Sequence, residues 1–166
     1  MISGHPTFMP RSAFRRALAD RLTGPSNRRH WLYVPYDQLT DAVGPLSRLD
    51  PRDTGLVLVE SPAKAALRPY HRMKLAYVLA NGRQFALEQA ARGVRVLHVV
   101  SDGSFADALA EVLPDTGPLD VMEPAERELR VELKPLVTAG ALRVIQHEGW
   151  LTTPEQFRTS QRGPPW

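Results

Sequence analysis

Five short apolar runs recur along the chain from residue 31 onward, and each has the length of a β-strand. The second run, residues 55–60, contains Leu-Val-Leu-Val with no alternation of polar and apolar positions. A strand with this pattern is covered on both faces, as strands in parallel sheets are. The runs predicted as strands are residues 31–35, 55–60, 94–100, 119–122 and 142–146.

Segments with helical periodicity separate these runs. Between the second and third strands, an apolar stripe with helical spacing covers residues 75–90. Gly82 lies within this stripe, where glycine costs about 1 kcal/mol relative to alanine, so we expect it to pack closely on the sheet. A further helix is predicted around residues 105–112. Another is predicted between Pro124, in its first turn, and Gly140, at its end.

This alternation predicts an α/β domain of right-handed βαβ units around a parallel sheet. The length of 166 residues suits one domain. We assign the domain to residues 30–160, with a basic and partly flexible N-terminal extension, residues 1–29, and a tail, residues 161–166. Within the extension, residues 12–22 are predicted to form a short helix with an apolar side made of Phe14, Leu18 and Leu22.

Positive charge is concentrated at the start of the chain. The first thirty residues hold six arginines and one acid, Asp20, while the remaining 136 residues hold 15 basic and 17 acidic side chains. The formal net charge of +3 therefore describes the extension better than the body. A weak DNA contact through this extension is one interpretation; a solvated arm or, less favoured, a transit peptide are the others.

The composition excludes several kinds of chemistry. The chain has no cysteine, which removes disulfides, thiolate metal sites, iron–sulfur ligation and cysteine nucleophiles from these residues. The apolar runs are too short to cross a membrane, and the start lacks the apolar segment of a secretory signal. We therefore expect a cytoplasmic protein without a membrane partner.

Candidate ligand-binding residues follow the predicted strands. Parallel α/β sheets bind ligands beyond the carboxyl ends of their strands, near the point where strand order reverses. The side chains selected in this way are Asp37, Gln38, Glu60, Ser61 and Glu123. Helix capping is an alternative for the carboxylates; it is favoured for Glu123 and balanced against binding for Asp37.

Motifs for catalysis are absent from the sequence. There is no glycine-rich phosphate loop, no nucleophile elbow and no histidine pair at metal-ligand spacing, so we assign no catalytic or metal-binding residue. His98 is interpreted as a satisfied core or edge residue. For the basic cluster of His71, Arg72 and Lys74, a solvated helix end is favoured over an anion site.

Six segments resemble one family, in order and with little change in spacing. Asp37-Gln38-Leu39-Thr40 is similar to the Gly-Asp-Gln-Leu-Ser turn of bacterial deoxyribodipyrimidine photolyase-related proteins, the iron–sulfur branch of cryptochromes and photolyases. The other similar segments are residues 57–60, 70–75, 81–86, 122–126 and 150–157. The resemblance covers residues 31–158, the whole predicted body.

The resemblance implies a Rossmann-like, doubly wound five-stranded sheet in three layers, with strand order 3-2-1-4-5. It also implies an antenna role, in which the domain binds a lumazine- or flavin-like light-harvesting chromophore at Asp37 and Gln38, with Glu60 nearby. The family's FAD and iron–sulfur cluster belong to a helical domain, and neither is expected in this chain. A helical FAD domain, removed by truncation or encoded separately in a split protein, is therefore the partner that the resemblance implies, and photolyase activity is expected only when such a domain completes the chain.

Three positions depart from the family pattern. Tyr36 replaces a glycine, Lys64 stands where an acid is common, and Leu67 stands where an aromatic residue can occur. Three hypotheses follow: a chromophore- or nucleotide-binding antenna-type domain, a non-catalytic module that docks a flavin domain, and a stand-alone enzyme with Asp37 or Glu123 as base. The third has the least support, because no nucleophile, metal set or phosphate loop accompanies these carboxylates.

Overall fold

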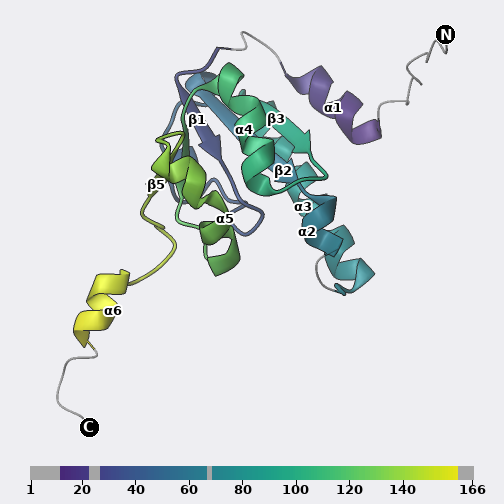
Figure 1. Cartoon of the computed structure of the whole chain (residues 1–166). Helices are drawn as coiled ribbons and strands as arrows, with labels where there is room; N and C mark the ends of the chain where they lie inside the picture. Colours follow the sequence, from purple (N-terminus) through teal and green to yellow (C-terminus); the bar gives the residue numbers. More distant parts are fainter. Residues whose placement is uncertain (1–11, 23–26, 67–68, 161–166) are drawn as a thin grey trace, which may run out of the picture.

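The computed structural model describes residues 12–22, 27–66 and 69–160, which form a five-stranded parallel sheet with helices on both faces (Figure 1). The strands are β1 (His30–Tyr33), β2 (Thr54–Glu60), β3 (Arg95–Val100), β4 (Leu119–Met122) and β5 (Leu142–Ile145). Their order is β3-β2-β1-β4-β5, and every neighbouring pair is parallel. The parallel α/β architecture expected from the pattern and the strand order implied by the resemblance are both confirmed.

The described part of the chain also contains six α-helices and two short 3-10 helices. They are α1 (Ala13–Arg21), η1 (Pro45–Ser47), η2 (Pro51–Asp53), α2 (Pro62–Ala66), α3 (Arg72–Ala91), α4 (Phe105–Thr116), α5 (Arg127–Thr138) and α6 (Pro154–Ser160). Of these, α1 precedes the first strand and α6 follows the last. The helix predicted within residues 12–22 is α1, and the apolar stripe at 75–90 belongs to α3. None of these helices is long and apolar enough to cross a membrane.

Two apolar layers separate the helices from the sheet. On one face, α1 and α3 contribute Leu18, Phe85, Ala86 and Ala90, which pack against strand residues such as Leu56. On the other face, α4 and α5 pack the buried side chains Phe105, Leu109, Val112, Leu129 and Leu133 against strand residues such as Val57. The chain thus has three layers, and α1 is part of one of them.

One glycine in the sheet allows an aromatic side chain to lie flat across the neighbouring strand. Trp31 of β1 pairs with Gly55 of β2 in the sheet register. A Cβ atom on Gly55 would overlap the Trp31 ring. The Trp31 side chain is consequently only 6% exposed despite its size.

Helix capping, which is favoured from the sequence for Glu123 and is one of two balanced alternatives for Asp37, explains neither carboxylate. The helix expected to begin at Pro124 begins at Arg127, so Glu126 takes the N-cap position instead of Glu123. The intervening turn is stabilised by Arg130, whose Nη1 donates to the carbonyl of Pro124 at 2.7 Å and to that of Ala125 at 2.9 Å. No α-helix follows Asp37 until α2, beyond β2, so capping does not explain this carboxylate.

Candidate functional site

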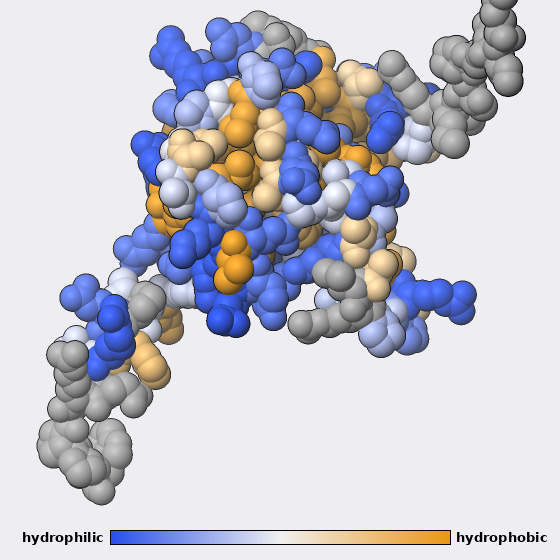
Figure 2. Space-filling view, viewed as in Figure 1, coloured by the Kyte–Doolittle hydropathy of each residue, from blue (hydrophilic) through white to orange (hydrophobic). Residues whose placement is uncertain are grey.

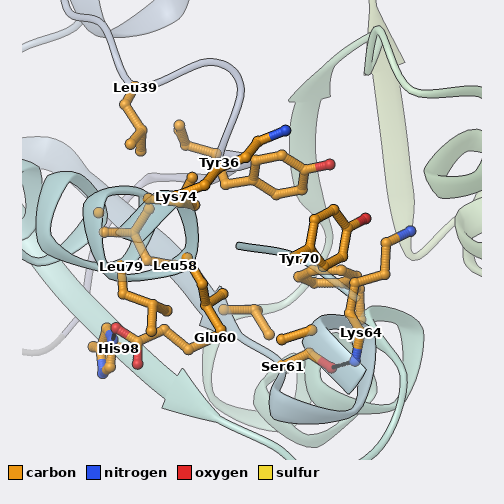
Figure 3. A pocket seen from close by; sticks show the side chains of 17 residues that line it. Tyr36, Leu39, Leu58, Glu60, Ser61, Lys64, Tyr70, Lys74, Leu79 and His98 are labelled. Carbon is orange, nitrogen blue, oxygen red and sulfur yellow. Dashed lines mark hydrogen bonds and ion pairs between the residues drawn. The ribbon is translucent and has the colours of Figure 1, made fainter. Parts of the chain in front are cut away.

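A cavity of about 220 Å³ opens at the carboxyl ends of β1 and β2, beneath the first half of α3. Figure 3 shows its two ends: Tyr36, Tyr70 and Lys64 lie at one, and Glu60 and His98 at the other. Its lining comes from the ends of β1, β2 and β3, from α2 and α3, and from the start of α4. Most of these side chains are apolar.

The apolar wall of the cavity is the first half of the α3 stripe. Leu75, Val78, Leu79 and Gly82 line the cavity, whereas the later stripe residues are buried in the core. A Cβ atom on Gly82 would meet no other atom within 4 Å. The expectation that Gly82 packs closely on the sheet is therefore wrong. Its missing side chain leaves open space beside the cavity.

The polar end of the cavity is centred on Glu60. Arg83 of α3 binds its carboxylate with two hydrogen bonds of 2.7 Å, Nε to Oε1 and Nη2 to Oε2. His98 Nε2 lies 2.9 Å from Oε1 and acts as the donor, because an ionised carboxylate only accepts. Burial raises the pKa of Glu60, but the hydrogen bonds and charges of Arg83 and His98 outweigh it, leaving that pKa at about 2. Glu60 is thus a structural anion with two fixed partners.

His98 is only partly satisfied, in contrast to its sequence-based interpretation. Its side chain is 5% exposed, and Nδ1 is buried with no hydrogen-bond partner in the described structure. Phe14 of α1 covers the imidazole edge to face, with ring centroids 4.8 Å apart. The Arg83 guanidinium lies 5.7 Å from the same phenyl centroid. The N-terminal helix therefore reaches the side chains at the polar end of the cavity.

A second polar group lies at the other end of the cavity. Glu126, just before α5, accepts a hydrogen bond from the Tyr36 hydroxyl and forms an ion pair of 3.0 Å with Lys64 Nζ. Burial and this hydrogen bond raise the pKa of Tyr36, which keeps the phenol protonated. The two departures from the family pattern at Tyr36 and Lys64 are thus joined by one carboxylate. The third, Leu67, lies outside the described residues.

The candidate residues fall into two groups. Glu60 and Ser61 line the cavity, and the Ser61 hydroxyl donates to the carbonyl of Gly103 at 3.0 Å. Asp37, Gln38 and Glu123 lie outside this lining. Their role as ligand contacts stays a prediction.

Gln38 occupies the point where strand order reverses, between β1 and β4. Its side chain is buried, and Nε2 donates to the carbonyls of Met122 at 3.2 Å and Glu123 at 3.1 Å. These bonds join the ends of the two strands and fill the crevice in which the general rule places a ligand. The cavity lies one strand further along, over β1 and β2. Asp37 is exposed beside Gln38.

Sequence reasoning missed lining residues such as Tyr70 and Phe105, and it missed Arg83, which does not line the cavity but binds Glu60. One signal was available in the sequence. The apolar stripe of α3 begins nearer the N-terminus of the helix than the part that packs on the sheet, so its first residues had no strand to cover them. Within the described ranges, no group of three or more histidine, aspartate or glutamate side chains is arranged to hold a metal ion.

Comparison with known proteins agrees with this architecture. A family model described as deoxyribodipyrimidine photo-lyase-related protein matches residues 32–164. The chain belongs to this family. The resemblance found in the motifs is therefore confirmed, and it covers every strand except the first two residues of β1. Helix α1 lies outside the matched region.

One curated relative is a (6-4) photolyase from Agrobacterium fabrum. It is 30% identical over 115 residues, which make up 65% of this chain and 23% of the relative. The chain thus spans less than a quarter of the length of that photolyase.

Proposed function

We propose that this photolyase-related chain binds a light-harvesting chromophore of the lumazine or flavin type in the cavity beneath α3. One observation carries the proposal: a largely apolar cavity of about 220 Å³ lies at the carboxyl ends of two parallel strands. Binding sites for small cofactors combine apolar walls with a few oriented polar groups at such strand ends. The chain would act as an antenna-type domain related to DNA photorepair, without catalysing repair itself.

The lining suits a planar ring with polar substituents. Leu75, Val78 and Leu79 offer an apolar surface on α3, and the open space at Gly82 allows a ring to approach the helix backbone. At the polar end, Glu60 Oε2 receives one hydrogen bond, from Arg83, and so has a lone pair for a ring N–H or hydroxyl group of a ligand. Tyr36 and Tyr70 supply aromatic surface at the other end.

The proposed partner is a helical FAD domain. The antenna role requires an acceptor for the absorbed energy, and the family resemblance implies FAD bound in a helical domain as that acceptor. These 166 residues contain no cysteine that could ligate an iron–sulfur cluster. Photolyase activity is therefore proposed only for this domain completed by a FAD domain.

A second candidate function is docking of that domain without any chromophore. The segment after β5 favours it, because Trp150, Leu151 and Phe157 expose 41%, 102% and 57% of their surfaces. Apolar side chains exposed together often mark protein interfaces. A FAD domain that binds this chain tightly while the cavity stays empty would support this alternative.

Absorption and fluorescence spectroscopy of the purified protein test the first proposal. Riboflavin and a ribityl lumazine are titrated separately into the wild type and into Gly82→Leu, whose side chain would fill the cavity. We expect shifted absorption and altered fluorescence with the wild type, and a large loss of affinity in the variant. A colourless protein that changes neither spectrum would reject chromophore binding, as would equal affinity in both proteins.

A further inference from the structure

Arginines gather at the edge of the sheet opposite the cavity. In a parallel sheet every strand begins at the same edge, so residues that precede different strands become neighbours. Arg28 and Arg29 precede β1, Arg52 precedes β2, and Arg92 and Arg95 surround the start of β3. We call these five residues the basic edge.

Backbone pairing places the basic edge on three adjacent strands. The Arg29 amide donates to the carbonyl of Asp53 at 2.9 Å, which joins the start of β1 to that of β2. Arg95 pairs with Gly55 in the register of β2 and β3. The Arg52 side chain lies 3.9 Å from the Cβ position of Gly93. Since neighbouring strands lie about 4.8 Å apart, these arginines start from backbone positions on three adjacent strands at one edge of the sheet.

Nearby acids neutralise only part of this charge. Asp53 pairs with Arg29 at 3.8 Å, and Asp41 pairs with Arg92. Asp50 accepts from the backbone amide of Arg52 instead of its guanidinium.

Three guanidinium groups remain without a carboxylate partner. Within the described part of the chain, Arg28, Arg52 and Arg95 form no ion pair. Arg28 Nε is also buried with no hydrogen-bond acceptor. These three arginines can therefore bind an external anion without first breaking an internal ion pair.

We infer that the basic edge binds the sugar–phosphate backbone of a nucleic acid, independently of base sequence and of the cavity. Guanidinium groups bind phosphate oxygens through two parallel hydrogen bonds, and a row of them can follow successive phosphates. From the sequence alone, only the N-terminal extension was expected to contact phosphate. Arg28 and Arg29 of that extension join three arginines of the body.

The surroundings favour a nucleic acid over an anionic membrane. Peripheral membrane binding combines basic residues with exposed apolar side chains that enter the lipid. None of the exposed large apolar side chains in the described structure belongs to the segments that directly precede β1, β2 or β3. In Figure 2, hydrophilic side chains predominate at the upper left of the molecule, near where the chain enters β1 in Figure 1.

Fluorescence anisotropy with a labelled random-sequence DNA duplex tests the inference. The proteins are the full-length wild type and the triple variant Arg28→Gln, Arg52→Gln, Arg95→Gln. We expect micromolar affinity for the wild type at about 50 mM salt and a loss of about tenfold or more in the variant. The slope of log affinity against log salt should fall by roughly two to three units, since each lost phosphate contact removes about 0.9.

A matched control variant separates position from net charge. Arg15→Gln, Arg72→Gln, Lys134→Gln removes the same charge from exposed sites on α1, α3 and α5. We expect it to retain at least half of the wild-type affinity and an unchanged salt slope. Circular dichroism and thermal unfolding verify that both variants fold.

Three results would overturn the inference. They are an equal loss of affinity in both triple variants, no duplex binding at low salt, and binding to phosphatidylserine vesicles but not to DNA. Riboflavin or lumazine titration of the basic-edge variant should match the wild type. Failure of the chromophore proposal and failure of the nucleic-acid proposal can thus be told apart.

Discussion

Replacement of Gly82 by alanine should stabilise the protein. Gly82 lies in the middle of α3 (Arg72–Ala91), where glycine is about 1 kcal/mol less favourable than alanine. The new Cβ atom would meet no neighbour within 4 Å, so no steric cost offsets this gain. We expect the free energy of unfolding to rise by about 0.5–1 kcal/mol. For a chain of this size, the melting temperature should rise by about 2–4 °C.

Gly82→Leu extends the same reasoning to function. Leucine is also a good helix former, and its side chain would occupy the open space at Gly82, a residue that lines the cavity. The variant should be at least as stable as the wild type and yet exclude a ring-shaped ligand. Loss of binding with retained stability would distinguish a filled cavity from a damaged fold.

Urea unfolding monitored by circular dichroism measures these effects. Gly55→Ala is the matched control, because its new Cβ would overlap the Trp31 ring and a shift of that ring would disturb the buried sheet. We expect this control to lose about 1–3 kcal/mol, as overpacked cores do. A loss of stability in Gly82→Ala would refute the reasoning, since it would mean that the position is already filled.

Three further substitutions test other parts of the structure by urea unfolding. Gln38→Leu leaves two strand-end carbonyls without donors and should cost about 1–3 kcal/mol, whereas Asp37→Asn, at the exposed neighbour, should stay within about 0.5 kcal/mol. Glu60→Gln should cost roughly 2–3 kcal/mol at pH 7; this difference should shrink as pH falls from 5 toward 2, because the native pKa of about 2 is below the ordinary value of 4.5 and wild-type stability is lost on protonation. Leu18→Ala should cost about 2–4 kcal/mol if α1 belongs to the core, whereas Leu151→Ala, at a fully exposed leucine, should be nearly neutral; equal effects would contradict the packing of α1.

The order of apolar runs and helical stripes was sufficient to predict the parallel α/β domain. Strands covered on both faces need uninterrupted apolar residues, and β2 has them, so its position was predicted almost to the residue. The start of α5 was predicted three residues too early. Pro124 is compatible with a first helical turn, but contacts of Arg130 with the carbonyls of the preceding segment stabilise a turn there instead.

The site was predicted less completely, because residues at a strand end can face several directions. Glu60 and Ser61 were identified from their position after β2, and both line the cavity. Gln38 was chosen by the same rule, yet its amide is used to join β1 to β4. A rule based on position cannot tell which strand-end side chains have partners inside the protein.

The sequence by itself determined the succession of elements, the family and the absence of cysteine chemistry in these residues, because each depends on residue type and local spacing. Only the tertiary structure decided that Gly82 opens into a cavity, that Phe14 of α1 covers His98, and that arginines of the extension and the body share one edge. These relations join residues distant in sequence. Strand pairing and helix packing bring them together, and no local pattern records those contacts.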